Sequence, residues 1–415
     1  MYYGLDVHKD FIQVCRLSAD GKQREDFSIR ATAEAVEAFA RTLTRKDQVA
    51  LEVTFHTWII YNILAPHAGR VVAVNATQVQ AIASAKIKTD KVDAHTLAQL
   101  LRADFLPAVQ MPSSKTWALR QLVSHRRLLL KQQTATKNTI HGILHRRLLP
   151  IPQGWNPFAQ KTRLWMRGLT LPSTERFMLD NALALLEQIE TRVAEVDEQL
   201  LQQARISESA KLLITIPGVN VTVAIGMLAA IDDVRRFPTP QKLGSYFGLV
   251  PRIRQSADRC YHGDITKAGN STARSLAIEA AQILARSSSP LAATYYRVRH
   301  KRGHNVAVTA LARKLVHVVW HVLSKREPYR YAPIPRTRIK LLRVTVDHAR
   351  SRCVPQTLEA VYAEAGLPPL SAASSGERRA AANNRRTRTR LDKASGKSSA
   401  SRKMQREAKT SLTNS

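Results

Sequence analysis

Cysteine is scarce in this chain of 415 residues. Only Cys15, Cys260 and Cys353 occur, and no CxxC pair is present. This argues against a disulfide scaffold and a cysteine-based zinc site, and it fits a reducing cytoplasm. Apolar runs of about 18 residues are also lacking, so no transmembrane helix is expected. The first residues contain no basic region followed by an apolar stretch, so no signal peptide is expected.

Acidic residues are missing from two long segments. No Asp or Glu occurs in 105–174, which has eleven Lys or Arg, or in 280–326, which has nine. The whole chain has 64 Lys and Arg against 32 Asp and Glu, a formal charge of +32. The segment 372–415 contributes +9 of this, so the remainder still carries +23. Such a charge argues against an enzyme of small neutral metabolites and predicts a polyanionic partner. Phosphate contacts explain affinity but not chemistry.

Short apolar runs alternate with amphipathic segments in residues 1–112, which we expect to form an α/β domain. The expected strands are Tyr2–His8, Phe11–Leu17, Phe27–Ile29, Gln48–Val53 and Val71–Val74. The expected helices are Thr32–Leu43, Trp58–Leu64 and Asp90–Leu106. The order βββαβαβα is that of a ribonuclease H-like nuclease fold.

Two long helices are predicted in the connector, residues 113–205. The first, 115–148, is basic, and Pro150, Pro152 and Pro157 break the pattern after it. The second, Glu175–Ala204, has apolar residues three or four apart, which is typical of a coiled-coil or helical-hairpin face. Thirty residues without a helix breaker also make self-association plausible.

The remaining residues divide into a mainly α C-terminal domain, 206–330, a basic extension, 331–370, and a tail, 371–415. Prolines interrupt the extension at Pro328, Pro333 and Pro335. The tail is rich in Ser, Ala, Asn and Arg, and we expect it to be disordered.

Four carboxylates lie on separate predicted elements. Asp6 is within the first apolar strand, Glu52 ends another strand, and Asp90 and Asp93 share one helix face. Such a set suits two divalent metals that bridge a scissile phosphate, with Mg²⁺ expected and Mn²⁺ as the alternative. A buried acid in an apolar strand is costly unless it is paired or metal-bound.

Each of these acids, considered alone, has a structural role as the alternative to metal binding. Asp6 could pair with Lys9 or His8, and Asp90 could cap a helix. Basic side chains near the helix acids could hold substrate phosphate or balance charge; they are Lys88, Lys91 and His95.

The segment Ile216-Pro217-Gly218-Val219-Asn220 resembles a helix-hairpin-helix turn, in which backbone N–H groups meet a nucleic-acid phosphate. Asn220 occupies the place of the usual second glycine, and Asn also tolerates positive φ. An ordinary Pro-Gly loop is the structural alternative.

Ser256 is flanked by Arg252, Arg254 and Arg259. A serine hydroxyl is a poor nucleophile unless a base or metal activates it, and attack on phosphorus also needs charge neutralisation, which Arg supplies. Serines beside arginines are common, so spacing alone favours a structural role for Ser256. The predicted nucleic-acid contacts are Gly218, Arg252, Arg254, Lys267, Asn270 and Arg274.

Two sets of motifs occur in order. The first is Asp6, Glu52, Asp90 and Asp93; the second is Ile216-Pro217-Gly218, Gly248-Leu249-Val250-Pro251, Gln255-Ser256 and Lys267-Ala268-Gly269-Asn270. Together they resemble the insertion-sequence 110 family of transposases, over about residues 1–325. The resemblance implies a RuvC-like domain whose four acids bind metal, a connecting coiled coil, and a C-terminal domain with a nucleophilic serine.

Carried over to this chain, the resemblance makes Ser256 the residue that forms a 5′-phosphoserine link to DNA. It also implies recombination guided by a bridge RNA, and a composite active site in which the serine of one subunit meets the acids of another in a tetramer. The expected partners are therefore double-stranded DNA, a structured guide RNA and further copies of the chain, as a dimer or tetramer, with no membrane. The expected location is the bacterial cytoplasm, in association with the nucleoid.

Some residues depart from the family pattern. Ala257 follows the serine where Gly is usual, and Asn220 and the Ala273-Arg274 pair also differ. The hypothesis that this chain is an inactive member of the family therefore stays open. Ser245 and Ser271 are weaker candidates for the nucleophile. Two other functions stay open: a RuvC-like nuclease using metal-activated water, and a non-catalytic nucleic-acid-binding protein.

Overall fold

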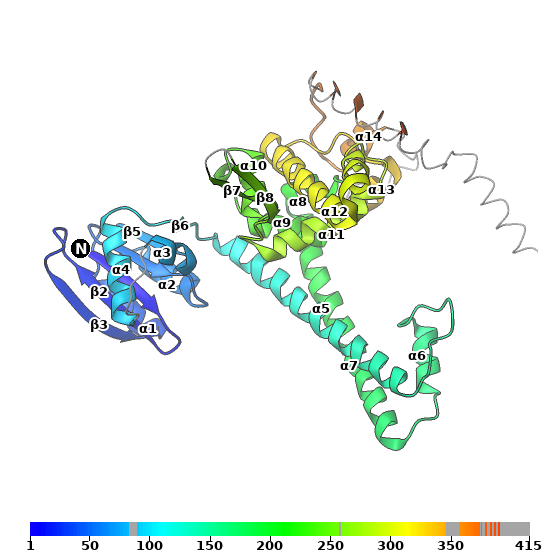
Figure 1. The fold of residues 1–415 in the computed structure, drawn as a ribbon, viewed down its shortest axis with the longest axis horizontal. Helices are drawn as coiled ribbons and strands as arrows, with labels where there is room; N and C mark the ends of the chain where they lie inside the picture. Colours follow the sequence, from blue (N-terminus) through cyan, green and yellow to red (C-terminus); the bar gives the residue numbers. More distant parts are fainter. Residues whose placement is uncertain are drawn as a thin grey trace, which may run out of the picture. The chain divides into compact units, whose positions relative to one another are not determined.

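The computed structural model describes residues 1–82, 89–256, 259–345 and 357–373, with isolated positions between 375 and 390. The chain forms two compact units, Met1–Ser113 and Ser114–Ser415, which are described separately (Figure 1). The predicted boundaries at 205/206, 330/331 and 370/371 stay predictions.

The first unit is a mixed α/β unit built on a six-stranded sheet with the order β3-β2-β1-β4-β5-β6. Its strands are β1 (Tyr2–Val7), β2 (Phe11–Leu17), β3 (Arg24–Arg30), β4 (Gln48–Glu52), β5 (Arg70–Val74) and β6 (Ala108–Val109). Its helices are α1 (Ala33–Thr42), α2 (Thr57–Leu64), α3 (Ala76–Ile82) and α4 (Asp90–Arg102). All the predicted strands and helices of this unit are present, while β6 and α3 were not predicted. The predicted stretch Phe27–Ile29 lies at the end of the third strand, which begins at Arg24 because its polar residues also pair with β2.

The two faces of this sheet pack against different helices. Odd-numbered residues of β1, such as Tyr3 and Leu5, share a core with Phe39 of α1 and Ile60 of α2. The opposite face receives α4, whose buried side chains are Ala94, Leu97, Ala98 and Leu101. Since strand side chains alternate between faces, Gly4 and Asp6 both lie on the α4 face.

The second unit begins with an antiparallel pair of long helices, α5 (Ser114–Arg146) and α7 (Ser173–Arg205), with α6 (Gln160–Arg167) between them in sequence. Both long helices were predicted, and α6 was not. The apolar seam of α7 is filled within the chain: Leu179, Leu183 and Leu186 pack with Ile140 and Ile143 of α5. The seam is therefore that of a helical hairpin, and by itself it gives no evidence of self-association.

The rest of this unit is mainly helical, as predicted, with one two-stranded hairpin. Its elements are α8 (Glu208–Ile214), α9 (Val221–Ile231), η1 (Val234–Arg236), α10 (Pro240–Tyr246), β7 (Pro251–Ser256), β8 (Arg259–Ile265), α11 (Ser271–Ala285), α12 (Ala292–Lys325), α13 (Ile334–Leu342) and α14 (Leu358–Glu364). Leu341 and Val344 after α12, with Val361 and Tyr362 of α14, belong to the same apolar core as α8 and α9. The described residues of the basic extension are thus packed onto the helical core.

One helix has the length and apolar composition of a membrane span. Among the described residues this is α12, and half of its most apolar stretch is buried inside the unit. No such helix was expected from the sequence. The buried residues of α12, among them Leu311, Leu315 and Val319, lie in the core that α11 also lines, which accounts for its apolar composition. Most residues after 373 lie outside the described part of the chain, so disorder of the tail stays a prediction.

Candidate active site

The register of β1 and β4 brings Asp6 and Glu52 to one end of the sheet. These strands are parallel, with Leu5 opposite Leu51. Asp6 and Glu52 follow Leu5 and Leu51 directly, so alternation places both on the α4 face. The sequence predicts these two acids, and the parallel pairing explains why they lie on neighbouring strands.

A close approach between α4 and β1 brings Asp90 to the same place. A Cβ on Gly4 would lie 2.0 Å from the carbonyl oxygen of Ala94, so only glycine allows α4 to pack this closely. Asp90 is the first residue of α4, one turn before Ala94. Thr89 is the N-cap and accepts a hydrogen bond from Val92 N. The alternative in which Asp90 caps the helix is therefore wrong.

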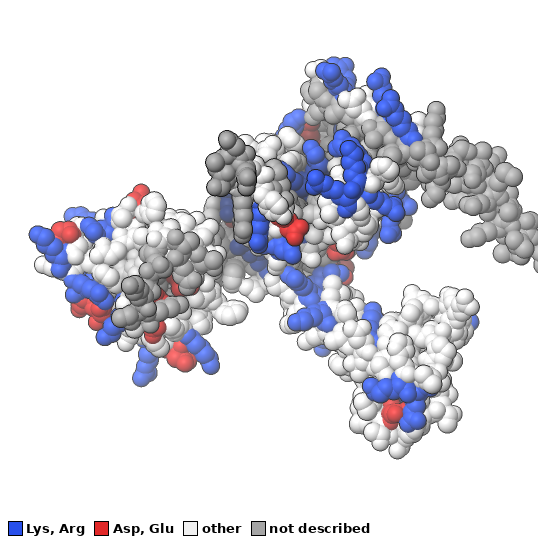
Figure 2. Space-filling view, in the orientation of Figure 1, with Lys and Arg blue, Asp and Glu red and all other residues white. Residues whose placement is uncertain are grey.

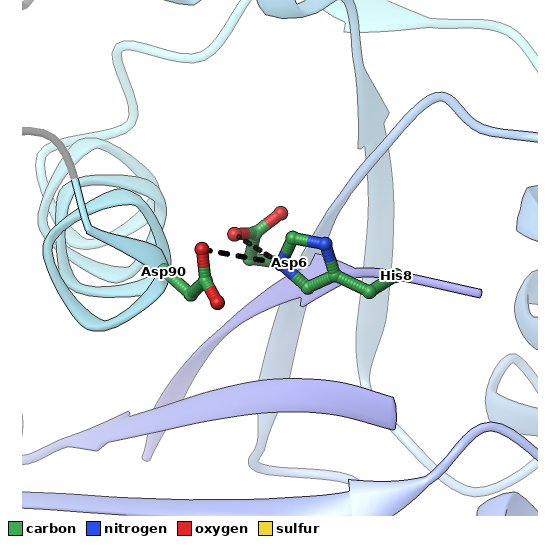
Figure 3. Close-up of side chains that lie close together, drawn as sticks. All are labelled: Asp6, His8 and Asp90. Atoms are coloured by element: carbon green, nitrogen blue, oxygen red, sulfur yellow. Dashed lines mark hydrogen bonds and ion pairs between the residues drawn. The ribbon is translucent and has the colours of Figure 1, made fainter. Parts of the chain in front are cut away.

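His8 lies between the two carboxylates (Figure 3). Its Nε2 is 3.1 Å from Oδ2 of Asp6 and 3.4 Å from Oδ1 of Asp90. Its ring stacks on Phe11, with the ring centroids 4.7 Å apart. The alternative in which Asp6 pairs with His8 is therefore confirmed. His8 was not predicted as a site residue, although its spacing of two from Asp6 places both on one side of an extended chain.

The surroundings of Asp6 disfavour the ionised form of its carboxyl. Asp6 is 7 % exposed. Burial raises the pKa of its carboxyl, His8 acts in the opposite sense, and the negative charges of Asp90 and Asp93 raise it further. A cation bound here would relieve this cost, because it would compensate both the burial and the repulsion.

The donor set suits a divalent metal ion. Within the part of the chain that the structure describes, single ligand atoms of Asp6, His8 and Asp90 lie within 4.8 Å of one another. Carboxylate oxygens suit Mg²⁺, and an added imidazole nitrogen is also compatible with Mn²⁺. Glu52 and Asp93 are outside this close group.

The basic residues near α4 have separate surroundings. His95 Nδ1 lies 3.6 Å from Sγ of Cys15, and burial lowers the pKa of His95. Lys91 is exposed, and its carbonyl accepts a hydrogen bond from Arg24. Lys88 lies outside the described residues.

Ser256 is the last residue of β7 and lies opposite Arg259 of β8 in the hairpin register. The structure describes neither residues 257–258 nor the side chains of Arg254 and Ser256, so their predicted roles stay predictions. Arg252 is exposed and donates to the carbonyl of Thr266 across the hairpin, at 3.3 Å.

Two glycines allow the loops at the base of this hairpin to pack closely together. Gly248 has a φ of +66°, and a Cβ there would lie 2.2 Å from the carbonyl oxygen of Ala268. Gly269 has a φ of +85°, and a Cβ there would lie 2.1 Å from the carbonyl oxygen of Tyr246. The two motifs that contain these glycines, residues 248–251 and 267–270, thus pack together at the base of the hairpin. We call this pair of loops the support.

Three predicted nucleic-acid contacts lie on or beside this support. Lys267 is exposed and has a φ of +54°. Asn270 caps α11 by accepting from Ala273 N at 2.9 Å, and Arg274 donates to the carbonyl of Phe247 at 3.1 Å. These last two side chains have structural partners, and their contact with nucleic acid stays a prediction.

The Pro-Gly turn joins α8 and α9. Gly218, not Asn220, takes the positive φ, at +90°, and a Cβ on it would lie 2.2 Å from the carbonyl oxygen of Ala280 in α11. Asn220 has a φ of −100° and caps α9 through Val223 N. The expectation of a positive φ at Asn220 is wrong, because an N-cap residue needs an extended backbone.

Comparison with known families matches both regions. A family model of IS110-type DEDD transposases, described as "Transposase", matches residues 3–147, and "Transposase IS116/IS110/IS902 family" matches residues 210–297. The chain belongs to the IS110 family of transposases. Its members are enzymes, so the non-catalytic alternative is not favoured.

Three relatives illustrate the extent of the similarity to this IS110-family chain. "Transposase for insertion sequence element IS1111A" of Coxiella burnetii is 28% identical, covering 59% of this chain and 68% of its own length. "Transposase for insertion sequence element IS1328" of Yersinia enterocolitica is 24% identical, covering 57% and 72%. "Pilin gene-inverting protein" of Moraxella bovis is 23% identical, covering 79% and 97%.

The two family matches separate the residues of this IS110-family chain into two groups. Asp6, His8, Glu52, Asp90 and Asp93 fall in the first match. Gly218, Ser256 and the Gly248–Gly269 support fall in the second. Helices α13 and α14 lie beyond both.

Proposed function

We propose that this transposase cuts and rejoins double-stranded DNA with metal-binding acids in a RuvC-like domain and Ser256 as nucleophile. The observation that carries the proposal is the grouping of Asp6, His8 and Asp90 at one end of the sheet, with Asp93 close enough to raise the pKa of Asp6. Glu52 on the neighbouring strand completes the set of acids. Mg²⁺ is the proposed ion, and Mn²⁺ is the alternative.

A bound divalent ion supplies charge neutralisation at the phosphate and lowers the pKa of an attacking hydroxyl. Asp6 and Asp90 would hold the ion through their carboxylates. In the metal-free protein, His8 orients the carboxylate of Asp6 through its Nε2 contact, and its stacking on Phe11 holds the imidazole in place.

Ser256 supplies the covalent chemistry. Its Oγ releases its proton and forms a bond to phosphorus, while the bond from phosphorus to the 3′ oxygen breaks and that oxygen takes up a proton. The product is a 5′-phosphoserine and a free 3′-hydroxyl. In rejoining, a 3′-hydroxyl of the exchanged strand attacks the phosphoserine and releases the serine. The number of phosphoester bonds is conserved, so no ATP is needed.

Rejoining distinguishes this proposal from a simple nuclease. The relative in Moraxella bovis is named for inverting a gene, and this chain matches 97% of its length. Inversion requires that the cut strands are joined again. The nuclease in which metal-activated water cleaves remains the competing mechanism.

The charge of the chain and its family support the proposed partners. The formal charge of +32 supports binding of nucleic acid, with Arg252, Arg254, Lys267 and Arg274 among the proposed contacts. A structured bridge RNA that selects the DNA, assembly as a dimer or tetramer, and a cytoplasmic, nucleoid-associated location are parts of the same proposal.

The test is an assay for a covalent protein–DNA adduct on a denaturing gel, with element ends, Mg²⁺ and transcripts from the flanking DNA. Wild type is compared with Ser256→Ala, Asp90→Asn and the control Ser271→Ala. We expect an adduct with wild type and Ser271→Ala only. Cleavage without an adduct that persists in Ser256→Ala would instead establish the nuclease. An adduct formed by Asp90→Asn would remove the acidic site from the reaction.

A further inference from the structure

A cavity of about 390 Å³ lies between the turn at Gly218, the end of α11 and the first turns of α13. Its cationic lining residues are Arg286, Arg336 and Lys340, and no Asp or Glu occurs among the described residues that line it. A cavity that two exposed guanidinium groups line, with no acid among the described residues beside them, favours an anionic occupant.

Lys340 is the residue that joins α13 to the turn. Its ammonium donates to the carbonyl of Ile214, to that of Ile216 at 2.9 Å and to that of Val219 at 3.0 Å. Burial lowers the pKa of Lys340 to about 7. The three carbonyls act in the opposite direction, because only the protonated amine has three N–H donors. The ammonium therefore holds the turn and α13 together at the base of the cavity.

The other two cations are available to a ligand. Arg286 follows α11 as its C-cap, and Arg336 lies in the first turn of α13. Both are exposed, and within the described residues neither has a carboxylate partner. Figure 2 shows Lys and Arg gathered over the part of this unit formed by α11, α12 and α13.

The beginnings of α9 and α13 also lie at the cavity, and the C-terminal end of α11 offsets part of their positive field. Asn220 caps α9, and Pro333 precedes α13; both residues line the cavity. The N-terminal end of a helix carries a partial positive charge from its unpaired N–H groups. The cavity and its exposed arginines are the primary observations, and the helix ends are secondary to them.

We propose that this cavity holds a backbone phosphate of the DNA duplex on which the enzyme acts, with Arg286 and Arg336 as its direct ligands and Lys340 as the residue that positions the turn. This inference rests on the proposed function, since it takes DNA as the substrate. It assigns a role to α13, which lies beyond both family matches. A phosphate contact carries no base specificity, so the site strengthens binding to any sequence equally.

The test is equilibrium binding of the full chain to a fluorescent 20-base-pair duplex in EDTA, at several salt concentrations. The variants are Arg286→Gln and Arg336→Gln, and the matched control is Arg343→Gln, an exposed arginine at the end of the same α13 that does not line the cavity. We expect each cavity variant to weaken binding by about fivefold to tenfold, and to reduce the salt slope by about one. The control is expected to change affinity less than twofold.

Equal losses from all three variants would overturn the inference, because they would mean that only net charge matters. A loss seen with a structured RNA of equal charge but not with the duplex would overturn it in favour of an RNA site. Binding in EDTA requires neither metal nor Ser256. A failure of the serine mechanism would therefore leave this test intact, and a failure here would leave the adduct assay intact.

Discussion

Gly4 of β1 and Ala94 of α4 approach so closely that a Cβ on residue 4 would lie 2.0 Å from the Ala94 carbonyl oxygen. This contact sets the height of α4 above the sheet, and with it the place of Asp90 next to Asp6. Backbone atoms of a packed helix cannot yield as a flexible side chain can. The geometry of the acidic site therefore depends on a glycine that carries no functional group.

Gly4→Ala is expected to destabilise the first unit by about 1–3 kcal/mol, the range for overpacking a core, and to reduce Mn²⁺ affinity and strand cleavage. Thermal unfolding and calorimetric titration with Mn²⁺ measure the two effects. The control is Gly142→Ala in α5, where the nearest atom to a new Cβ is 3.7 Å away. Unchanged Mn²⁺ affinity in Gly4→Ala would mean that α4 does not position the ligands.

Asp6→Asn is expected to stabilise the metal-free protein while it abolishes metal binding. The pKa of Asp6 is raised in the folded state, so the folded chain binds more protons than the unfolded chain between the two pKa values. Stability contributed by Asp6 is thus lost as pH rises through that window, and at pH 7 the ionised group destabilises the fold. Removing the charge should add about 0.5–2 kcal/mol.

Thermal unfolding in EDTA at pH 7 and Mn²⁺ titration check this prediction. Glu34→Gln, in the first turn of α1, is the control for loss of one negative charge; because hydrogen bonds lower the pKa of Glu34, this variant is expected to lose stability instead. A lower melting temperature for Asp6→Asn would show that the carboxylate is paired favourably without metal.

Lys340→Met is expected to destabilise the second unit by about 2–4 kcal/mol, because buried carbonyls at the turn lose their donor. The carbonyls concerned belong to Ile214, Ile216 and Val219. Chemical denaturation followed by circular dichroism measures the change, with Arg343→Met on the same helix as the control. A loss no larger than that of the control would mean that water replaces the ammonium at little cost.

The lowered pKa of His317 predicts that the protein loses stability in acid. Burial lowers the pKa of His317 from 6.5 to about 4, and Arg313, Lys314 and His321 add to this effect. Within the described residues, its buried Nε2 has no hydrogen-bond partner. The unfolded chain thus binds more protons between pH 6.5 and 4, so stability falls as pH falls through this window.

Unfolding free energies at pH 7, 6, 5 and 4.5 measure this dependence. One pKa unit corresponds to about 1.4 kcal/mol, so the lowered pKa of His317 corresponds to at most about 3.5 kcal/mol, and to less after solvent screening. His317→Gln should flatten the profile, whereas His125→Gln, at an exposed position of α5, should leave it unchanged. Identical profiles for wild type and His317→Gln would assign the acid sensitivity to other groups.

Local patterns in the sequence were enough to predict most of the elements. Strand alternation and helical periodicity depend on neighbouring residues, so β1, β2, β4, α5 and α7 could be recognised from the chain alone. The short α3, α6 and β6 were not predicted, since short elements have too few residues to show a period. The acids themselves could be selected because a charge within an apolar strand is unusual.

The amino-acid sequence alone was enough to indicate the family, the order of most elements, the basic character and the set of acids. Which of these residues meet depends on the tertiary structure. It placed His8 between Asp6 and Asp90, left Glu52 and Asp93 outside the closest group, and gave the positive φ to Gly218 instead of Asn220. It also joined Lys340 to a turn more than 120 residues earlier. These relationships depend on strand register, helix height and long-range packing, which short-range periodicity does not encode.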